Sequence, residues 1–107
     1  MVDIVWAMTL INTLNSRGCL TFKEIEYLDE EWGINGVPLS RHKSALRYWL
    51  NELFKRGFIE NIGKRRKSKI LCLAGLGRWL SEYLEDYGEF GRRFEFALDN
   101  DIFYIYN

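Results

Sequence analysis

The sequence predicts an α+β domain that is mostly helical, with one small antiparallel β-sheet and an extra C-terminal segment. Three observations lead to this fold class. Apolar residues recur every three or four positions over several segments, as they do on one face of an α-helix. Two short β-prone runs flank a basic stretch that begins with glycine, as in a hairpin. The 107 residues, 48% of them apolar, suffice for a single hydrophobic core without a structural metal or a set of disulfides.

The first expected helix covers residues 3–15 and stops at residues 16–18, Ser-Arg-Gly. It carries two apolar stripes, which are Ile4, Met8 and Ile11, and Val2, Trp6 and Leu10. Two stripes need two packing partners. One should face the core, and the other should face either the C-terminal tail or a second subunit.

A short extended piece at residues 19–21 leads into the second expected helix. Thr21 is followed three residues later by Glu24, which is the spacing of a capping box at a helix N-terminus. The residues that this helix should bury are Phe22, Ile25, Leu28 and Trp32. It ends at the turn-rich residues 33–36.

Ser40 is predicted to cap a third helix, of about residues 40–56, that ends at Gly57. At about 100° per residue, its apolar side consists of Leu39, Leu46, Trp49, Leu50 and Leu53. Its opposite side is polar and consists of Arg41, Ser44, Tyr48, Asn51 and Lys55, with Arg47 on the flank. His42, the one histidine, lies about 40° from the apolar side, so we expect a packed or capping residue and not a catalyst.

Residues 58–62 and 70–74 are predicted to be strands, joined by a loop at 63–69. A fourth helix follows and carries Leu76, Trp79, Leu80, Tyr83 and Leu84. We expect residues 1–87 to form the domain. Residues 88–107 are then an acidic, aromatic C-terminal extension that either mediates dimerisation or packs within the chain.

Charge is unevenly distributed along a chain whose formal net charge is zero. Residues 41–78 contain eleven basic and two acidic side chains, a segment charge of +9, whereas residues 1–40 and 79–107 carry −4 and −5. An ordinary surface interleaves both signs. The concentration of cations therefore predicts a surface that binds a polyanion. The alternative for the loop at 63–69 is a solvated hairpin tip whose charges discourage edge-to-edge aggregation.

Several other function classes are not supported by the sequence. No run reaches the roughly 18 apolar residues of a membrane span, and the first residues contain an acid and no base, unlike a secretory signal. Two cysteines and one histidine are too few for a zinc site. There is no glycine-rich phosphate loop and no convergent acid–base pair. We therefore expect a cytoplasmic protein, nucleoid-associated or in a host-cell interior, that is not an enzyme and uses no metal, cofactor or membrane.

The element order and three stretches of sequence resemble the winged helix-turn-helix family of DNA-binding domains, particularly its MarR-like and PadR-like branches. The stretches are LTFKEIEYL, PLSRHKSALRYWLNELFKRGFIE and GKRRKSKILCLAGLGRWLSEYL, within about residues 4–86. The most specific parts are Leu50-x-x-Leu53-x-x-x-Gly57-Phe58-Ile59 and Leu73-x-x-x-Gly77. One departure is Ala74, which stands where the family commonly has a threonine that caps the last helix, so the start of that helix is left open.

The resemblance implies a transcriptional regulator that binds double-stranded DNA as a homodimer. The third helix would enter the major groove and the loop at 63–69 would be a wing on the backbone or in the minor groove. The implied DNA-binding residues are Ser40, Arg41, Ser44, Arg47, Tyr48, Asn51, Lys55, Lys64, Arg65, Arg66, Lys67 and Lys69. Their chemistry agrees, because Asn suits adenine edges and Arg suits guanine edges or phosphates. The alternative is a winged-helix protein-interaction module that does not bind DNA directly.

In the resembled fold the strand at 19–21 pairs with the strand at 70–74, which would make Cys19 and Cys72 neighbours on one side of the sheet. A disulfide closing this loop of about 50 residues would contribute roughly 4 kcal/mol of stability. Nothing in the sequence indicates an oxidising compartment. We therefore expect two free thiols, with the disulfide as the alternative.

Overall fold

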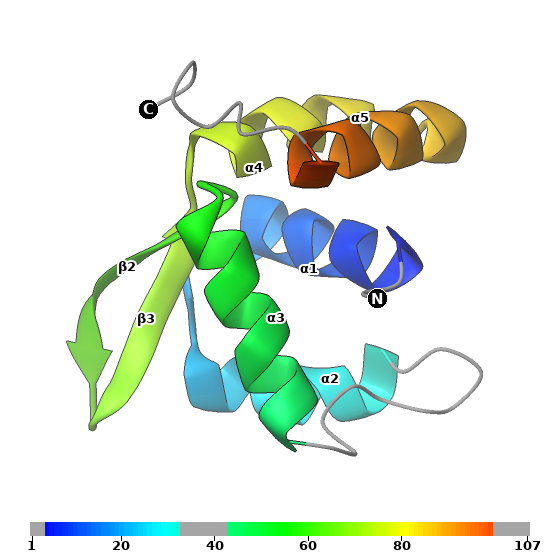
Figure 1. Ribbon diagram of the computed structural model, residues 1–107. Helices are drawn as coiled ribbons and strands as arrows, with labels where there is room; N and C mark the ends of the chain where they lie inside the picture. Colours follow the sequence, from blue (N-terminus) through cyan, green and yellow to red (C-terminus); the bar gives the residue numbers. More distant parts are fainter. Residues whose placement is uncertain (1–3, 33–42, 100–107) are drawn as a thin grey trace.

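The computed structural model describes residues 4–32 and 43–99, which contain five α-helices and a three-stranded antiparallel sheet (Figure 1). The elements in chain order are α1 (Ile4–Arg17), β1 (Leu20–Thr21), α2 (Phe22–Trp32), α3 (Lys43–Lys55), β2 (Ile59–Arg65), β3 (Ser68–Leu73), α4 (Gly75–Leu80), the 3₁₀ helix η2 (Ser81–Tyr83) and α5 (Tyr87–Asp99). The prediction of an α+β, mostly helical fold with a small antiparallel sheet is confirmed. None of the described helices is long and apolar enough to span a membrane.

The core surrounds α1, which lies between α4 and α5 on one side and α2 and α3 on the other (Figure 1). The buried residues of α1 are Trp6, Ala7, Leu10, Ile11 and Leu14. The buried carboxylate of Asp29 on α2 accepts a hydrogen bond from the indole Nε1 of Trp6 at 2.6 Å. The described residues of both apolar stripes of α1 thus pack within one chain, and Val2 lies outside the described residues.

The start of α2 has the capping box that the sequence predicts. The backbone N–H of Thr21 donates to Glu24 Oε1 at 2.9 Å, and the backbone N–H of Glu24 donates to Thr21 Oγ1 at 3.2 Å. These reciprocal bonds satisfy two N–H groups that a helix N-terminus otherwise leaves without intrahelical partners.

The sheet has the strand order β1-β3-β2, and its hairpin is longer than the sequence predicts. The prediction of a loop at 63–69 is wrong. The pairing of β2 with β3 continues through Lys64↔Lys69 to Arg65↔Ser68, so only Arg66 and Lys67 form the turn. These two residues have positive φ angles of 50° and 68°, which a tight hairpin turn requires and which asparagine or glycine usually supplies. A bulge between residues 61 and 63 lets the strands stay paired.

The start of α4, left open by Ala74, is set by the backbone. Ala74 is the N-cap residue and makes no side-chain capping bond. Instead the N–H of Leu76 donates to the carbonyl of Gly57 at 3.0 Å, and that of Ala74 donates to the carbonyl of Phe58 at 3.0 Å. The prediction of one fourth helix through residue 84 is also wrong. The α-helix α4 ends at Leu80, and the separate 3₁₀ helix η2 follows it directly.

The C-terminal extension begins with α5, whose apolar face belongs to the core. Phe90 and Phe94 are fully buried, and the ring centroids of Phe94 and Phe58 are 5.4 Å apart. An added Cβ at Gly91 would lie 3.3 Å from Ile4, so α5 packs closely on α1. Residues 88–99 therefore pack within the chain, and the core is not complete at Tyr87. Residues 100–107 lie outside the described part.

Candidate nucleic-acid interface

The surface of α3 is divided as the helical projection predicts. Leu46, Leu50 and Leu53 are buried, whereas the side chains exposed on the other side are Arg47, Tyr48, Asn51, Phe54 and Lys55. At about 100° per residue, Asn51 lies at the centre of this exposed face, with Arg47 and Lys55 about 40° to either side and Phe54 and Tyr48 about 60° to either side. An amide thus lies between two cations and two aromatic rings.

Arg47, Asn51 and Lys55 also form a line along the helix axis. They are spaced four residues apart, so the line extends over about 12 Å at a rise of 1.5 Å per residue. The guanidinium carbon of Arg47 lies 5.9 Å from the centroid of the Phe22 ring, a cation–π contact that holds this side chain against the start of α2.

Glu52 is the one acidic residue of α3, and its charge is partnered. Its carboxylate lies 3.7 Å from Nη2 of Arg56, and its side chain is only 19% exposed. A carboxylate in this state repels an approaching polyanion less than an exposed, unpaired carboxylate would. The exposed face of α3 is therefore cationic and polar.

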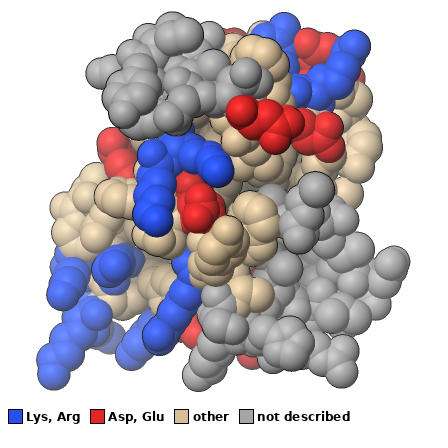
Figure 2. All heavy atoms as spheres, in the orientation of Figure 1, with Lys and Arg blue, Asp and Glu red and all other residues tan. Residues whose placement is uncertain are grey.

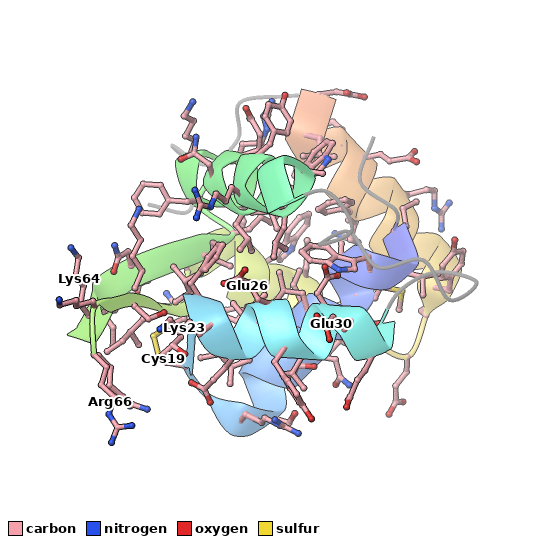
Figure 3. All side chains as sticks on the ribbon, turned by 90° about the horizontal axis from the view of Figure 1, so that it is seen from below. Cys19, Lys23, Glu26, Glu30, Lys64 and Arg66 are labelled. Carbon is pink, nitrogen blue, oxygen red and sulfur yellow. A yellow bond between two sulfur atoms is a disulfide. The ribbon has the colours of Figure 1, made fainter. Side chains whose placement is uncertain are left out.

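The second part of the candidate interface is the basic hairpin, which we define as the five exposed cations Lys64, Arg65, Arg66, Lys67 and Lys69. The hairpin projects beside α3 (Figure 1), and Figure 2 shows Lys and Arg side chains gathered over it and over the C-terminal end of α3, with isolated acidic side chains between. In Figure 3 Lys64 and Arg66 point to different sides of the hairpin. The basic hairpin therefore presents charge in more than one direction.

Lys23 joins this surface, although no pattern in the sequence pointed to it. Its backbone N–H donates to Oγ of the buried Ser68 at 3.1 Å, which attaches the first turn of α2 to the hairpin. Its side chain is exposed at the same end of the molecule as Lys64 and Arg66, whereas Glu26 and Glu30 lie farther along α2 (Figure 3). The capping box at Thr21 predicted the start of this helix but not its position beside the hairpin.

Hydrogen bonds from Thr21 and the positive charge of the hairpin both lower the pKa of Glu24. The backbone and side-chain hydrogen bonds from Thr21 lower the pKa of this carboxyl group, and the positive charges of Arg65 and Arg17 lower it further, while burial acts in the opposite direction. The positive charge of Arg65 is therefore felt by a carboxyl group on α2. Its register partner Ser68 also contacts α2.

The base of the hairpin is joined to β1 by a disulfide between Cys19 and Cys72, with a Cα–Cα distance of 4.4 Å. The expectation of free thiols is therefore wrong. The pairing of Leu20 with Leu71 brings the two cysteines opposite each other on the same side of the sheet, as the resemblance implied. Cys19 is exposed, and its bond crosses from the α1–α2 connection to β3.

The structure thus brings together nine of the predicted interface residues, on two neighbouring elements. Ser40 and Arg41, like His42, lie outside the described residues, and Ser44 is described only as part of the α3 backbone. Among residues 4–32 and 43–99, no group of three His, Cys, Asp or Glu side chains could hold a metal ion.

A separate groove of about 840 Å³ lies between α1 and residues 81–87. Its lining residues are Val5, Met8, Thr9, Asn12, Asn15, Ser81, Glu82, Leu84, Glu85 and Tyr87, and none of them is basic. The start of α5 and the hairpin tip lie at opposite sides of the molecule (Figure 1), so this groove is not part of the cationic surface.

Comparison of the chain with protein-family models, with curated proteins and with solved structures gives no match.

Proposed function

We propose that this chain is a winged helix-turn-helix DNA-binding protein that acts as a transcriptional regulator. In this proposal α3 enters the major groove and the basic hairpin is the wing, lying on the backbone or in the minor groove. The observation that carries the proposal is that the exposed cations of α3 and of the basic hairpin occur on neighbouring elements, with Asn51 at the centre of the exposed face of α3.

The dimensions and the charges support this arrangement. The major groove of B-DNA is about 12 Å wide and accepts a single α-helix. Asn51 can pair with a base edge there, while Arg47 and Lys55 on either side can contact phosphates or bases. The basic hairpin would release counterions from the DNA, which adds affinity with little sequence preference.

The basic hairpin provides the test. Fluorescence anisotropy on random-sequence duplexes, repeated at several salt concentrations, would compare the natural chain with a K64Q/R65Q/R66Q/K67Q variant. The variant should bind all sequences more weakly, and the negative slope of log K against log salt should become shallower by about 0.9 for each phosphate group that the variant no longer neutralises. Unchanged affinity and slope would contradict the proposal.

A pair of single substitutions controls for net charge. Lys67→Gln in the hairpin turn and Arg92→Gln on α5 each remove one positive charge, and both side chains are exposed. Only Lys67→Gln should make the salt dependence shallower. Equal effects would mean that total charge, and not the hairpin surface, determines binding.

The proposal includes a homodimer on a two-fold site, with half-sites about 10 base pairs or a multiple apart. The buried faces of α1 and α5 pack on each other within one chain, so a dimer must use the residues that stay exposed. A monomer mass in light scattering at micromolar concentration would contradict this part of the proposal.

A protein-interaction module is the second candidate, and the groove between α1 and residues 81–87 favours it. That groove combines apolar side chains such as Met8 and Leu84 with the carboxylates of Glu82 and Glu85. If the chain showed no salt-sensitive binding to random DNA at low salt, this second function would be preferred.

A further inference from the structure

Tyr48 is an aromatic side chain exposed on the face of α3 that would meet DNA. It is 56% exposed, although large aromatic side chains are usually buried to a much greater extent. Its ring is not without support, because it packs edge-on against Trp49 with a centroid distance of 5.3 Å. Trp49 is half-buried and packs against the core. The helix thus presents a positioned aromatic ring to solvent.

Tyr48 and Asn51 are three residues apart, so they are neighbours on the surface of the helix. An asparagine amide pairs with the N6 and N7 atoms of adenine, and an apolar group contacts the C5 methyl of thymine, which is the apolar feature of the major groove. A ring and an amide side by side therefore match an adenine and a nearby thymine.

A cytosine, in contrast, is read by a carboxylate that accepts a hydrogen bond from its N4 amino group. The carboxylate that α3 could offer is Glu52, which is 19% exposed and paired with Arg56. The described part of α3 thus presents groups suited to adenine and thymine and no exposed, unpaired carboxylate for cytosine, while Arg47 and Lys55 remain free to contact phosphates or guanine.

We infer that α3 selects duplexes with adjacent A·T pairs, in which Asn51 binds an adenine and the ring of Tyr48 contacts the methyl group of a neighbouring thymine. This inference rests on the proposed function. It adds the class of sequence that is bound and assigns the thymine contact to Tyr48.

Base analogues that change single groups test the inference. The full chain would first be used to select a duplex from a random library. Each thymine of that duplex would then be replaced in turn by uracil, which removes only the methyl group, and each adenine by 7-deaza-adenine, which removes only the N7 acceptor. At one thymine, loss of the methyl group should weaken binding about fourfold. This ratio corresponds to the free energy of burying one carbon group, about 0.8 kcal/mol.

Protein variants assign each effect to its residue. Tyr48→Ala should bind the thymine and uracil duplexes equally. Tyr48→Phe should keep the preference for thymine because the ring is retained. Asn51→Ala should lose the discrimination against 7-deaza-adenine and keep the preference for thymine. Tyr27→Ala is the matched control, because Tyr27 is 67% exposed but lies on α2. It should keep both preferences.

The outcomes separate this inference from the function on which it rests. Salt-sensitive binding without any discrimination between thymine and uracil would overturn the inference alone. A thymine preference that persists in Tyr48→Ala would do the same. A complete lack of salt-sensitive binding to duplex DNA would overturn both the inference and the proposed function.

Discussion

Gly77 determines how closely α4 can approach the chain that precedes β2. A Cβ added at this position would lie 2.1 Å from the carbonyl oxygen of Phe58 and 2.9 Å from a methyl group of Leu73. The first of these atoms belongs to the backbone and accepts the bond from Ala74, so it cannot rotate away. This contact gives a physical reason for the Leu73-x-x-x-Gly77 pattern in the sequence.

Gly77→Ala is therefore expected to lower the free energy of unfolding by about 3 kcal/mol, because the backbone must shift to accommodate the new methyl group. Gly88→Ala is the matched control. It lies in α5, and its new Cβ would have only the Asp86 carboxylate at 3.8 Å. Urea unfolding should show a change of less than about 1 kcal/mol for this control. Equal stability of the two variants would contradict the close approach of α4.

The capping carboxylate of Glu24 gives stability a specific pH dependence. Its pKa is lowered in the folded state from an ordinary value of 4.5, so it favours folding while it is ionised. Its contribution is complete above that ordinary value and is lost as pH falls through the lower, folded value. Because the carboxyl group is exposed, we expect its ionisation to contribute less than about 1 kcal/mol to the free energy of unfolding.

The measurement compares the natural chain with Glu24→Gln by urea unfolding from about pH 7 to about pH 3. The difference in unfolding free energy should be constant near neutral pH and should shrink in acid. A difference that does not change with pH would mean that the charge of Glu24 has no role in the cap.

The residues of the candidate interface could be predicted in part. The helical repeat correctly placed Arg47, Tyr48, Asn51 and Lys55 on the exposed side of α3, because one buried stripe fixes the direction of the other side chains, but it did not single out the exposed Phe54. The sequence did not reveal Lys23, because its position depends on contact between α2 and the hairpin. It also gave no sign of the left-handed φ angles of Arg66 and Lys67, which are residue types that rarely adopt them.

Among the elements, the helices with clear end signals were predicted best. Thr21 with Glu24, and Gly57 after the basic end of α3, mark helix boundaries by local chemistry. The lengths of the hairpin and of α4 depend instead on pairing and packing with distant segments. The same holds for α5, because its Phe90 and Phe94 could fill this core or an interface with another subunit, and the spacing of apolar residues does not distinguish the two.

The disulfide between β1 and β3 connects residues 53 apart, so it should restrict the unfolded chain strongly. Reduction, or the substitution Cys19→Ser, is expected to lower the free energy of unfolding by about 4 kcal/mol. Cys19 is the better position for this change because its side chain is exposed, so no cavity forms. Unfolding with and without a dithiol reductant measures the effect, and Cys19→Ser should no longer respond to the reductant. If both cysteines of the native protein react with an alkylating reagent in the absence of reductant, the disulfide is not present.

For the whole molecule, the cationic surface and the acidic groove lie apart, although the acidic residue Glu24 of α2 lies next to the hairpin. The basic hairpin and the exposed face of α3 lie at one side, and the groove with Glu82 and Glu85 lies at the other. Charge counting along the chain could predict an excess of cations but not which elements share a surface, because that depends on how the hairpin packs beside α3.

Above all, α3 and the basic hairpin are expected to bind one duplex together. The most direct measurement is an NMR titration of the isotopically labelled chain with a duplex of about 15 base pairs, about one and a half helical turns. The backbone amide signals of residues 47–55 and 64–69 should shift together and saturate at the same DNA concentration, while those lining the groove of α1 and residues 81–87 stay unchanged. Shifts confined to the groove, or a hairpin that responds without α3, would contradict this joint binding.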